Sequence, residues 1–310
     1  MAVSVEQSRL GEIRPLVPAW LNDELEGRVL IGNPDAVILV GGINRTNTGA
    51  LATAIGRAQI QPDGITRHIQ PIKAIARRLI AGREGLNPST PLTFLKDRME
   101  IGDGVHLIKE TVGPNLHNPA EWVDSLALVL KKGCLPKKTT FIPTFRDPVA
   151  TAISWQRMWQ WNWDEFPWDS FNLSFSLSQE SWEEAETAGV AVVPYVHELI
   201  HLYPPEIILK CICDRIGIHF SQEMIAWGNE DAYWAGKIIK YDIPPDSWIR
   251  GALAKSKGGR GGLVWQPVDL PDNSIIELIR RKSKPAREIF NWANNRACHI
   301  LELTTHENHQ

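Results

Sequence analysis

The sequence predicts an α/β fold, a single domain whose central, mostly parallel sheet is flanked by helices. Short apolar runs are each followed by a loop marked by glycine or proline and then by a helical pattern, which is typical of a parallel sheet covered by helices. The 310 residues, 43% of them apolar, are enough to bury a full core. We therefore expect one domain over residues 1–310, with its main part at about 36–266 and a helical tail at 272–303.

Four strand-loop-helix units follow one another along the chain. Apolar runs predict strands at 36–41, 105–109, 139–145 and 189–195. Capping residues and glycine stops predict helices at about 50–58, at 70–81 before Gly82, at 118–133, from Asp147 and Pro148 onward, and at 205–216. Pro143 argues against a central place for the third strand, because proline donates no ladder hydrogen bond.

Composition and charge narrow the class of ligand. The formal charge of −3 gives no electrostatic footprint for nucleic acid or for an anionic membrane, so a small molecule is the expected partner. We expect a cytoplasmic protein, because the chain has neither a signal-peptide pattern nor the roughly 20 apolar residues that span a bilayer. The four cysteines lack zinc or disulfide-framework spacing, so buried thiols and no metal site are expected.

The loop after the first strand, residues 42–51, is the first candidate ligand site. Ligands of open parallel sheets bind beyond the carboxyl ends of the strands. Backbone N–H groups at such a turn favour an anion, and Arg45, Thr46 and Thr48 add further donors, so a phosphate site is predicted. The loop lacks the Lys-Ser/Thr pair of G-x-x-x-x-G-K-[ST], which argues against a kinase or ATPase. An ordinary polar turn is the alternative.

A second candidate follows the third strand. Arg146 ends that strand, and Ser154 falls about two helical turns after Asp147 on the same face of the next helix. A guanidinium fork and a hydroxyl can together hold one phosphate group. The alternative is a helix-capping Arg-Asp pair with an incidental serine.

These residues carry a family resemblance. Arg146-Asp147-Pro148 with Ser154 resembles the Arg-[Asp/Asn]-Pro-x5-Ser element with which sulfotransferases hold the 3′-phosphate of 3′-phosphoadenosine 5′-phosphosulfate (PAPS). The first loop resembles their P-[RK]-S-G-T-[TS]-x-L loop, at Asn44, Arg45, Thr46, Asn47, Thr48, Gly49 and Leu51. It departs from that pattern at Asn44, Asn47 and Gly49.

Two looser likenesses extend the resemblance over about residues 36–266. One is His197-Glu198-Leu199-Ile200 with Pro204, similar to the family's Tyr-Glu-Asp-Leu-x3-Pro segment. The other is a late loop that closes over the nucleotide in the family, here Lys257-Gly258, Gly261-Gly262 and Trp265. The resemblance implies that this loop binds the donor through Lys257, Gly258, Gly259 and Arg260.

What the resemblance implies is a P-loop-like sulfotransferase architecture with a nucleotide-binding core at 36–266. Such an enzyme moves a sulfuryl group from PAPS to a hydroxyl or amine of a small acceptor and leaves 3′-phosphoadenosine 5′-phosphate. A metal is not demanded, because the group carries less charge than a phosphoryl group. Arg45 would stabilise the leaving oxygen, Lys109 would contact the bridging oxygen and Glu110 would accept the acceptor proton.

One condition and two alternatives apply to this catalytic assignment. Neighbours on an extended strand face opposite ways, so Lys109 and Glu110 converge only if the strand ends between them. His106 and His117 are the alternative bases.

The acceptor is expected to be a cation. Six of the 13 tryptophans lie within 155–182, with many carboxylates and one basic residue, Arg157, nearby. Aromatic faces with carboxylates hold cations, which predicts an acceptor site at Trp155, Trp159, Trp163, Asp164, Glu165 and Trp168. A guanidinium or amine natural product of secondary metabolism is the expected class, as for cyanobacterial sulfotransferases that act on saxitoxin-type alkaloids. The alternative is a packed helix with a solvated acidic loop.

Two other functions stay open. A nucleotide-dependent kinase on a P-loop fold would need ATP and magnesium, and the missing Gly-Lys-Ser/Thr opposes it. A non-catalytic protein that binds a small ligand on the same fold would account for the departures at Asn44 and Asn47.

Overall fold

The computed structural model describes residues 16–58, 64–85, 96–225, 237–241 and 269–303. The predicted strands form β2 (Ala36–Gly42), β5 (Val105–Lys109), β6 (Thr139–Phe145), and the short β7 (Ala191–Val192) and β8 (Tyr195–Val196). With β3 (Ile65–Ile69) and β9 (Ile238–Lys240) they make a seven-stranded sheet, ordered β7-β6-β2-β5-β3-β9 with β8 beside β6. Every pairing in it is parallel. The α/β class with a mostly parallel sheet is confirmed.

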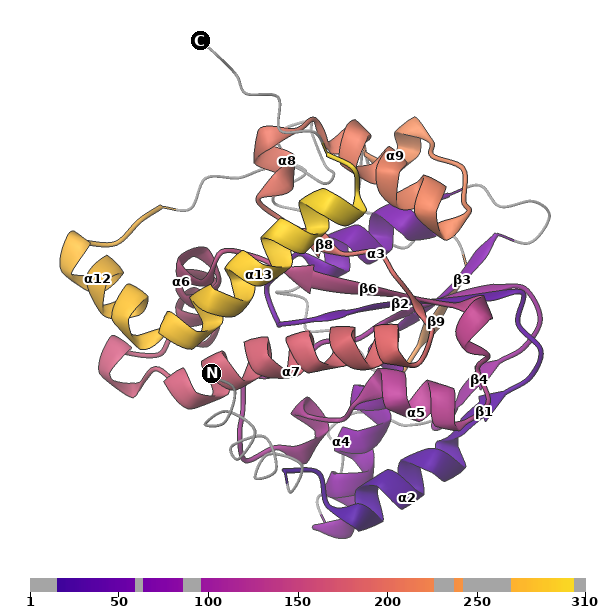
Figure 1. Cartoon of the computed structure of the whole chain (residues 1–310). Coiled ribbons are helices and arrows are strands. Elements are labelled where there is room, and N and C mark those ends of the chain that lie inside the picture. Colours follow the sequence, from indigo (N-terminus) through magenta and orange to yellow (C-terminus); the bar gives the residue numbers. More distant parts are fainter. Residues whose placement is uncertain (1–15, 59–63, 86–95, 226–236, 242–268, 304–310) are drawn as a thin grey trace.

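Helices cover both faces of the sheet (Figure 1). One face carries α3 (Thr48–Gly56), α8 (Leu199–Leu202) and α9 (Pro205–Ile216), and the other carries α2 (Ala19–Arg28), α4 (Pro71–Arg83), α5 (Ser125–Lys131) and α7 (Trp168–Thr187). After α6 (Pro148–Trp159), the chain ends in α12 (Asn273–Lys282) and α13 (Lys284–Ile300), which pack against α6 and α7. No helix of the described ranges is long and apolar enough to cross a membrane.

Several elements were not predicted, because their residues are polar or few. Strand β3 reads ITRHI, and its Arg67 and His68 are buried in spite of their polarity. The pair β1 (Val29–Ile31) and β4 (Met99–Ile101) forms a separate two-stranded sheet of three residues each. Buried polar residues and very short strands both remove the apolar pattern on which a strand prediction depends.

The helix predicted over 118–133 is wrong in its first part. Asn118 caps only a 3₁₀ turn, Pro119–Glu121, where its side chain accepts from Ala120 N–H. Helix α5 begins after Asp124, whose side chain accepts from Ala127 N–H at 2.9 Å. A second capping residue therefore starts the helix six residues later than the first one.

Pro143 lies in an interior strand, contrary to the expectation from proline. The carbonyls of Phe141 and Phe145 accept from Val193 and His197, so the odd residues of β6 present their backbone to β7 and β8. Pro143 presents its nitrogen to the same side, where the run predicted at 189–195 is broken at Pro194 into β7 and β8. The missing N–H faces this break and disrupts no ladder.

The remaining predicted helices are present with small shifts of their ends. Gly82 does not end α4, which continues to Arg83. Gly217 ends α9 in the left-handed conformation, as expected. Pro285 stands in the first turn of α13 and marks the predicted interruption of the tail.

Candidate functional site

The topology gathers the predicted site residues at one edge of the sheet. Strands β5 and β6 lie on either side of β2, so the chain reverses its direction of winding across β2. Such a reversal opens a crevice at the carboxyl ends of the strands, where α/β proteins bind ligands. The loops that follow β2, β5 and β6 all meet there.

The loop after β2 is held in an unusual conformation by its own polar groups. Arg45 and Asn47 have φ of 74° and 65°, a region that non-glycine residues rarely adopt. Gly42 has φ 150°, and a Cβ there would lie 2.6 Å from the Thr144 carbonyl oxygen. Thr46 is fully buried and its hydroxyl contacts Ile43 O at 2.7 Å and Thr144 Oγ1 at 2.8 Å. The loop is therefore fixed by the strand beside it.

Three contacts join this loop to its neighbours. Trp155 Nε1 donates to Asn44 O at 2.7 Å, and Asn44 Nδ2 donates to Gly113 O. Asn47 Nδ2 lies 2.8 Å from His197 Nδ1. The departures from the family pattern at Asn44 and Asn47 thus supply the bonds that hold the loop against β5 and β8. The sequence gives no signal for these pairings, since they span 69 to 150 positions.

The predicted phosphate residues meet. Arg45 Nε donates to Ser154 Oγ at 3.0 Å, and Arg146 Nη1 donates to Arg45 O at 3.3 Å. Two guanidinium groups and a hydroxyl therefore share one place at the edge of the sheet. Among the residues that the structure describes, the buried Nε of Arg146 has no hydrogen-bond acceptor. A buried donor of this kind is available to an anionic ligand.

The helix after β6 is anchored as expected. The Asp147 side chain caps α6 by accepting from Ala150 N–H at 2.9 Å, and Asp147 N–H donates to Glu198 Oε1 at 2.9 Å. Burial raises the pKa of Glu198 to about 7. A carboxyl group that protonates so readily repels a nearby anion less than an ordinary carboxylate does.

Lys109 and Glu110 stand at the end of β5 without forming an ion pair. Lys109 is half-buried, and its ammonium makes no hydrogen bond or ion pair within the described part of the chain. Burial lowers its pKa, and the neighbouring Lys73 lowers it further. Glu110 is buried, and its Oε1 accepts from Ile72 N–H, at the start of α4, at 2.7 Å. Burial raises the pKa of this carboxyl group.

The two side chains do not face the same space. The backbone stays extended beyond Lys109, because Glu110 N–H and Val112 N–H donate to Val40 O and Gly42 O of β2. Glu110 lines a cavity on the α5 and α7 side of the sheet, and Lys109 is not among the lining residues. This is the alternation expected of an extended chain, so the condition for convergence is not met.

The two alternative bases are placed differently. His106 lies three residues before Lys109, about 10 Å back along the strand. Its Nδ1 contacts His68 Nε2 at 2.9 Å and its Nε2 contacts Asp103 O at 3.1 Å, so both nitrogens are engaged away from the edge. His117 is exposed on the loop after Gly113. Glu110 remains the candidate base with the best placement.

Lys73 is a buried residue of the site that the sequence analysis missed. Its Nζ donates to Thr111 O at 3.0 Å and Gly113 O at 3.1 Å, and it pairs with Glu121. Glu121 also pairs with Arg77 at 2.6 Å. Lys73 thereby braces the segment that follows Glu110. The spacing of Lys73 and Arg77, four apart on one helix face, was the available signal.

The tryptophan-rich segment is largely packed on itself. Trp155 is fully buried and packs edge-on against Trp159 and Phe171, with ring centroids 5.5 and 5.2 Å apart. The half-buried side chains Trp159, Trp161, Trp163 and Trp168 surround Phe166 or stack on each other. Asp164 and Glu165 are exposed. Trp155 thus offers no free face to a ligand, and the acceptor site predicted at these residues stays a prediction.

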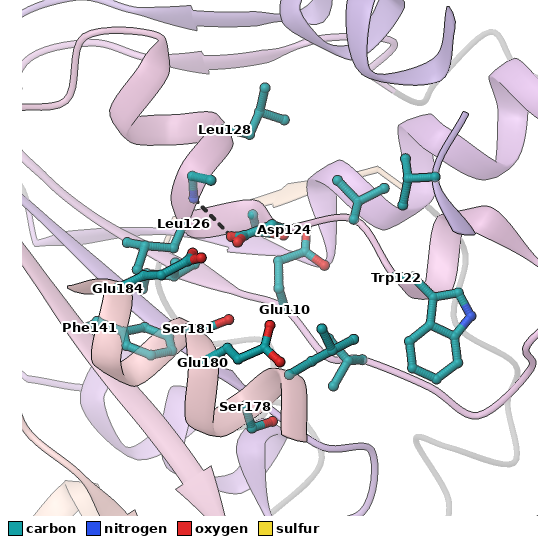
Figure 2. Close-up of a pocket in the computed structure, with 18 of the residues that line it drawn as sticks. Glu110, Trp122, Asp124, Leu126, Leu128, Phe141, Ser178, Glu180, Ser181 and Glu184 are labelled. Carbon is teal, nitrogen blue, oxygen red and sulfur yellow. Dashed lines mark hydrogen bonds between the residues drawn. The ribbon is translucent and has the colours of Figure 1, made fainter. Parts of the chain in front are cut away.

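A cavity of about 510 Å³ opens elsewhere, between the sheet and helices α5 and α7 (Figure 2). Its apolar wall includes Leu39 and Phe141 from the sheet and Leu126 and Leu128 from α5. Glu110, Asp124, Glu180 and Glu184 supply carboxylates. None of the predicted acceptor residues lines it.

The remaining predicted donor residues, Lys257, Gly258, Gly259 and Arg260, lie outside the described residues. Within the described ranges, no group of three or more His, Cys, Asp or Glu side chains is arranged to hold a metal ion. In comparisons with known proteins, no family model and no curated protein matches the chain.

Proposed function

We propose that this protein is a PAPS-dependent sulfotransferase of the P-loop-like architecture, acting on a hydroxyl or amine of a small, cationic acceptor. The observation that carries the proposal is the meeting of Arg45, Arg146 and Ser154 at the carboxyl edge, with the buried Arg146 Nε lacking an acceptor in the described residues. These three are positions of the resemblance to the sulfotransferase phosphate elements. They fit an anionic donor because each offers N–H or O–H groups to phosphate oxygens.

The residues divide the work of sulfuryl transfer. The donor, when bound, supplies a sulfuryl group already bonded to a good leaving phosphate. Arg45, Arg146 and Ser154 hold its phosphate groups, and Lys109 meets the negative charge that grows on the leaving oxygen. Glu110 is proposed to accept the proton of the acceptor hydroxyl or amine, but its side chain faces the opposite side of the extended chain from that of Lys109, so its role as base is the part of the proposal that Glu110→Gln tests. Asn44, Asn47 and Trp155 keep the first loop in place through the contacts described above.

A thermal-shift experiment tests the proposal. A saturating concentration of 3′-phosphoadenosine 5′-phosphate should raise Tm by several degrees, because ligand at about 100 times Kd adds about 2.7 kcal/mol to the free energy of unfolding. Arg146→Ala should remove this shift. The matched control is Arg157→Ala, which truncates a half-exposed arginine of α6, the helix that follows Arg146, and should leave the shift unchanged.

Other outcomes point to the alternatives. A shift produced by ATP with magnesium, and not by the 3′-phosphorylated nucleotide, would identify a kinase. No response to either nucleotide would leave a protein that binds some other small ligand, and the proposal would be withdrawn.

A further inference from the structure

The carboxyl group of Glu198 lies beside the proposed anion site. Its Oε1 accepts from Asp147 N–H at 2.9 Å, and Asp147 directly follows Arg146 and caps α6. Arg146 in turn donates from Nη1 to Arg45 O at 3.3 Å. Glu198 and Arg146 are close enough for the charge of each to act on the pKa of the other. Glu198 is therefore part of the surroundings of any anion that Arg146 holds.

Two buried polar atoms at this place have no hydrogen-bond partner within the described residues. One is Nε of Arg146, which is a donor, and the other is Oε2 of Glu198. The bonds that these two side chains do make run to Arg45 O and from Asp147 N–H, and not to each other. Buried polar groups are rarely left unpaired, because burial without a partner is costly. Both atoms are thus available to one bound group.

An anion can satisfy both atoms only when Glu198 carries a proton. The oxygens of a phosphate or sulfate group accept hydrogen bonds, which suits Arg146 Nε. An ionised carboxylate also only accepts, and its negative charge repels the anion. A protonated carboxyl group instead offers an O–H donor and carries no charge. The neutral form of Glu198 is therefore the one that matches an anionic ligand.

The surroundings of Glu198 already favour this neutral form. Burial raises its pKa to about 7, and the carboxylate of Asp147 also raises it, whereas the bond from Asp147 N–H and the charge of Arg146 act against the rise. Tyr195 of β8 also interacts with Glu198, and burial raises the pKa of this phenol, so it is neutral where Glu198 titrates. The neighbouring His197 has its Nδ1 3.1 Å from Tyr195 OH. A bound anion would add a further like charge beside Glu198.

We infer that Glu198 is a further binding residue of this site, which acts as a neutral acid and donates the O–H of its Oε2 to an oxygen of the bound anion. Where Glu198 is ionised in the free protein, it takes this proton from solvent as the anion binds. Arg146 then binds the anion as a cation, and Glu198 binds it as an uncharged donor. The inference rests on the proposed function only for the identity of the anion, a phosphate group of the nucleotide.

The pH dependence of anion affinity tests this role. Binding that raises the pKa of a group takes up a proton, so affinity is highest at low pH and falls as pH rises through the pKa of the free protein. Calorimetry at constant ionic strength would measure the affinity for sulfate and for 3′-phosphoadenosine 5′-phosphate at about pH 7 and about pH 8.5, where both probes keep their full charge. We expect the affinity of the parent protein to fall about tenfold between them, since one unit of pKa shift is a factor of ten.

The variant Glu198→Gln separates this residue from every other group that titrates. Its amide oxygen can accept from Asp147 N–H, and its amide N–H can donate to the anion without a proton from solvent. Its affinity should be within about twofold of the parent at about pH 7 and about tenfold higher than the parent at about pH 8.5. Glu198→Met is neutral without a donor, so it should bind more weakly than Glu198→Gln at both pH values.

Two controls place the effect. Glu223→Gln neutralises an exposed carboxylate beside Arg57, at the opposite end of α3 from the loop after β2, and should keep the pH dependence of the parent. Arg146→Ala should abolish the binding of sulfate, which assigns the anion to this site. Retained sulfate affinity in Arg146→Ala would place the anion elsewhere and would overturn the inference.

The remaining outcomes are equally direct. A gain of affinity at high pH in Glu198→Gln supports the role, whereas an equal loss at both pH values would make Glu198 only a structural partner of α6. Equal affinity of Glu198→Met and Glu198→Gln would remove the hydrogen bond from the inference and overturn it. If Glu198→Gln does not fold, as judged by its Tm, proton uptake by the parent on binding sulfate decides, and no uptake at about pH 8 overturns the role. If sulfate behaves as expected and the nucleotide does not bind, Glu198 keeps its role and the transfer reaction must be abandoned.

Discussion

The two walls that meet at the carboxyl edge of the sheet carry opposite charges. On the side of the loop after β2 and helix α6, Arg45 donates to Ser154 and Arg146 donates to the Arg45 carbonyl. On the side of α5 and α7, carboxylates of Glu110, Glu180 and Glu184 face a cavity. The edge between them holds Lys109 and Glu110 as neighbours in sequence. The two sides of this edge thus differ in the kind of charged side chain that they present.

Lys109 and Glu110 do not behave as an ion pair, as the directions of their pKa shifts show. In an ion pair, the lysine pKa would rise and the carboxylate pKa would fall. Here burial lowers the pKa of Lys109 and raises that of Glu110, so each group is pushed toward its neutral form. Desolvation of both groups therefore outweighs the attraction between them.

The largest effect is expected from Glu110→Gln, which removes the proposed base and keeps the shape of the side chain. We expect kcat to fall by about 10²–10⁴-fold, the usual contribution of a general base. The raised pKa of Glu110 also predicts that kcat/KM of the unchanged protein falls with decreasing pH well above the ordinary range of a glutamate. Steady-state rates across pH would check both, and Glu110→Asp should restore part of the rate.

Stability gives an independent readout of the same variant. A carboxyl group whose pKa is raised in the folded state adds stability at low pH that is lost as pH rises through that pKa. Gln can still accept from Ile72 N–H, so at pH 8 the free energy of unfolding of Glu110→Gln should be no lower than that of the parent, and higher by the order of 1 kcal/mol. A loss of both rate and stability would instead make Glu110 a purely structural cap of α4.

The second largest effect on kcat is expected from Lys109→Met, which removes the cation on the side of the chain opposite Glu110. If Lys109 meets the leaving oxygen as proposed, losing this cation should reduce kcat by about 10²–10³-fold. A bound dianion should raise the lowered pKa of Lys109, so nucleotide binding should take up protons between pH 7 and 9. Calorimetry in buffers of different ionisation enthalpy measures this uptake. If Lys109→Met retains the full uptake, the lysine does not meet the nucleotide.

Some features of the fold and of the site could be predicted from the sequence, and others could not. The strand-to-helix units depend on local apolar runs and were found in the predicted places, while the clamp of Arg146 and Ser154 stays a prediction, since the bond to Ser154 comes from Arg45. Strand β3 was missed because Arg67 and His68 are buried within the sheet, and His68 is paired with His106 and Tyr241. Such long-range pairings leave no periodic trace.

The cavity was beyond prediction for a related reason. The carboxylates of Glu180 and Glu184 were seen in the sequence, but only the packing of α7 across from α5 turns them toward Glu110. The tryptophans near them suggested a ligand surface, although Trp155 and Phe166 are needed to fill the local core. Composition detects an unusual segment and does not decide between a core and a binding surface.

The smallest effect is expected from Ser154→Ala, which tests the anion wall alone. Ser154 Oγ already accepts from Arg45 Nε at 3.0 Å, so its own hydrogen is free to be donated to a phosphate oxygen. Removing both bonds should weaken nucleotide affinity by about five- to tenfold, near 1 kcal/mol, with kcat little changed. Ser178→Ala, a serine in the wall of the acidic cavity, should leave nucleotide affinity unaltered. Equal losses in the two serine variants would mean that the walls do not bind separate ligands, because a ligand on one wall is then sensitive to a hydroxyl on the other.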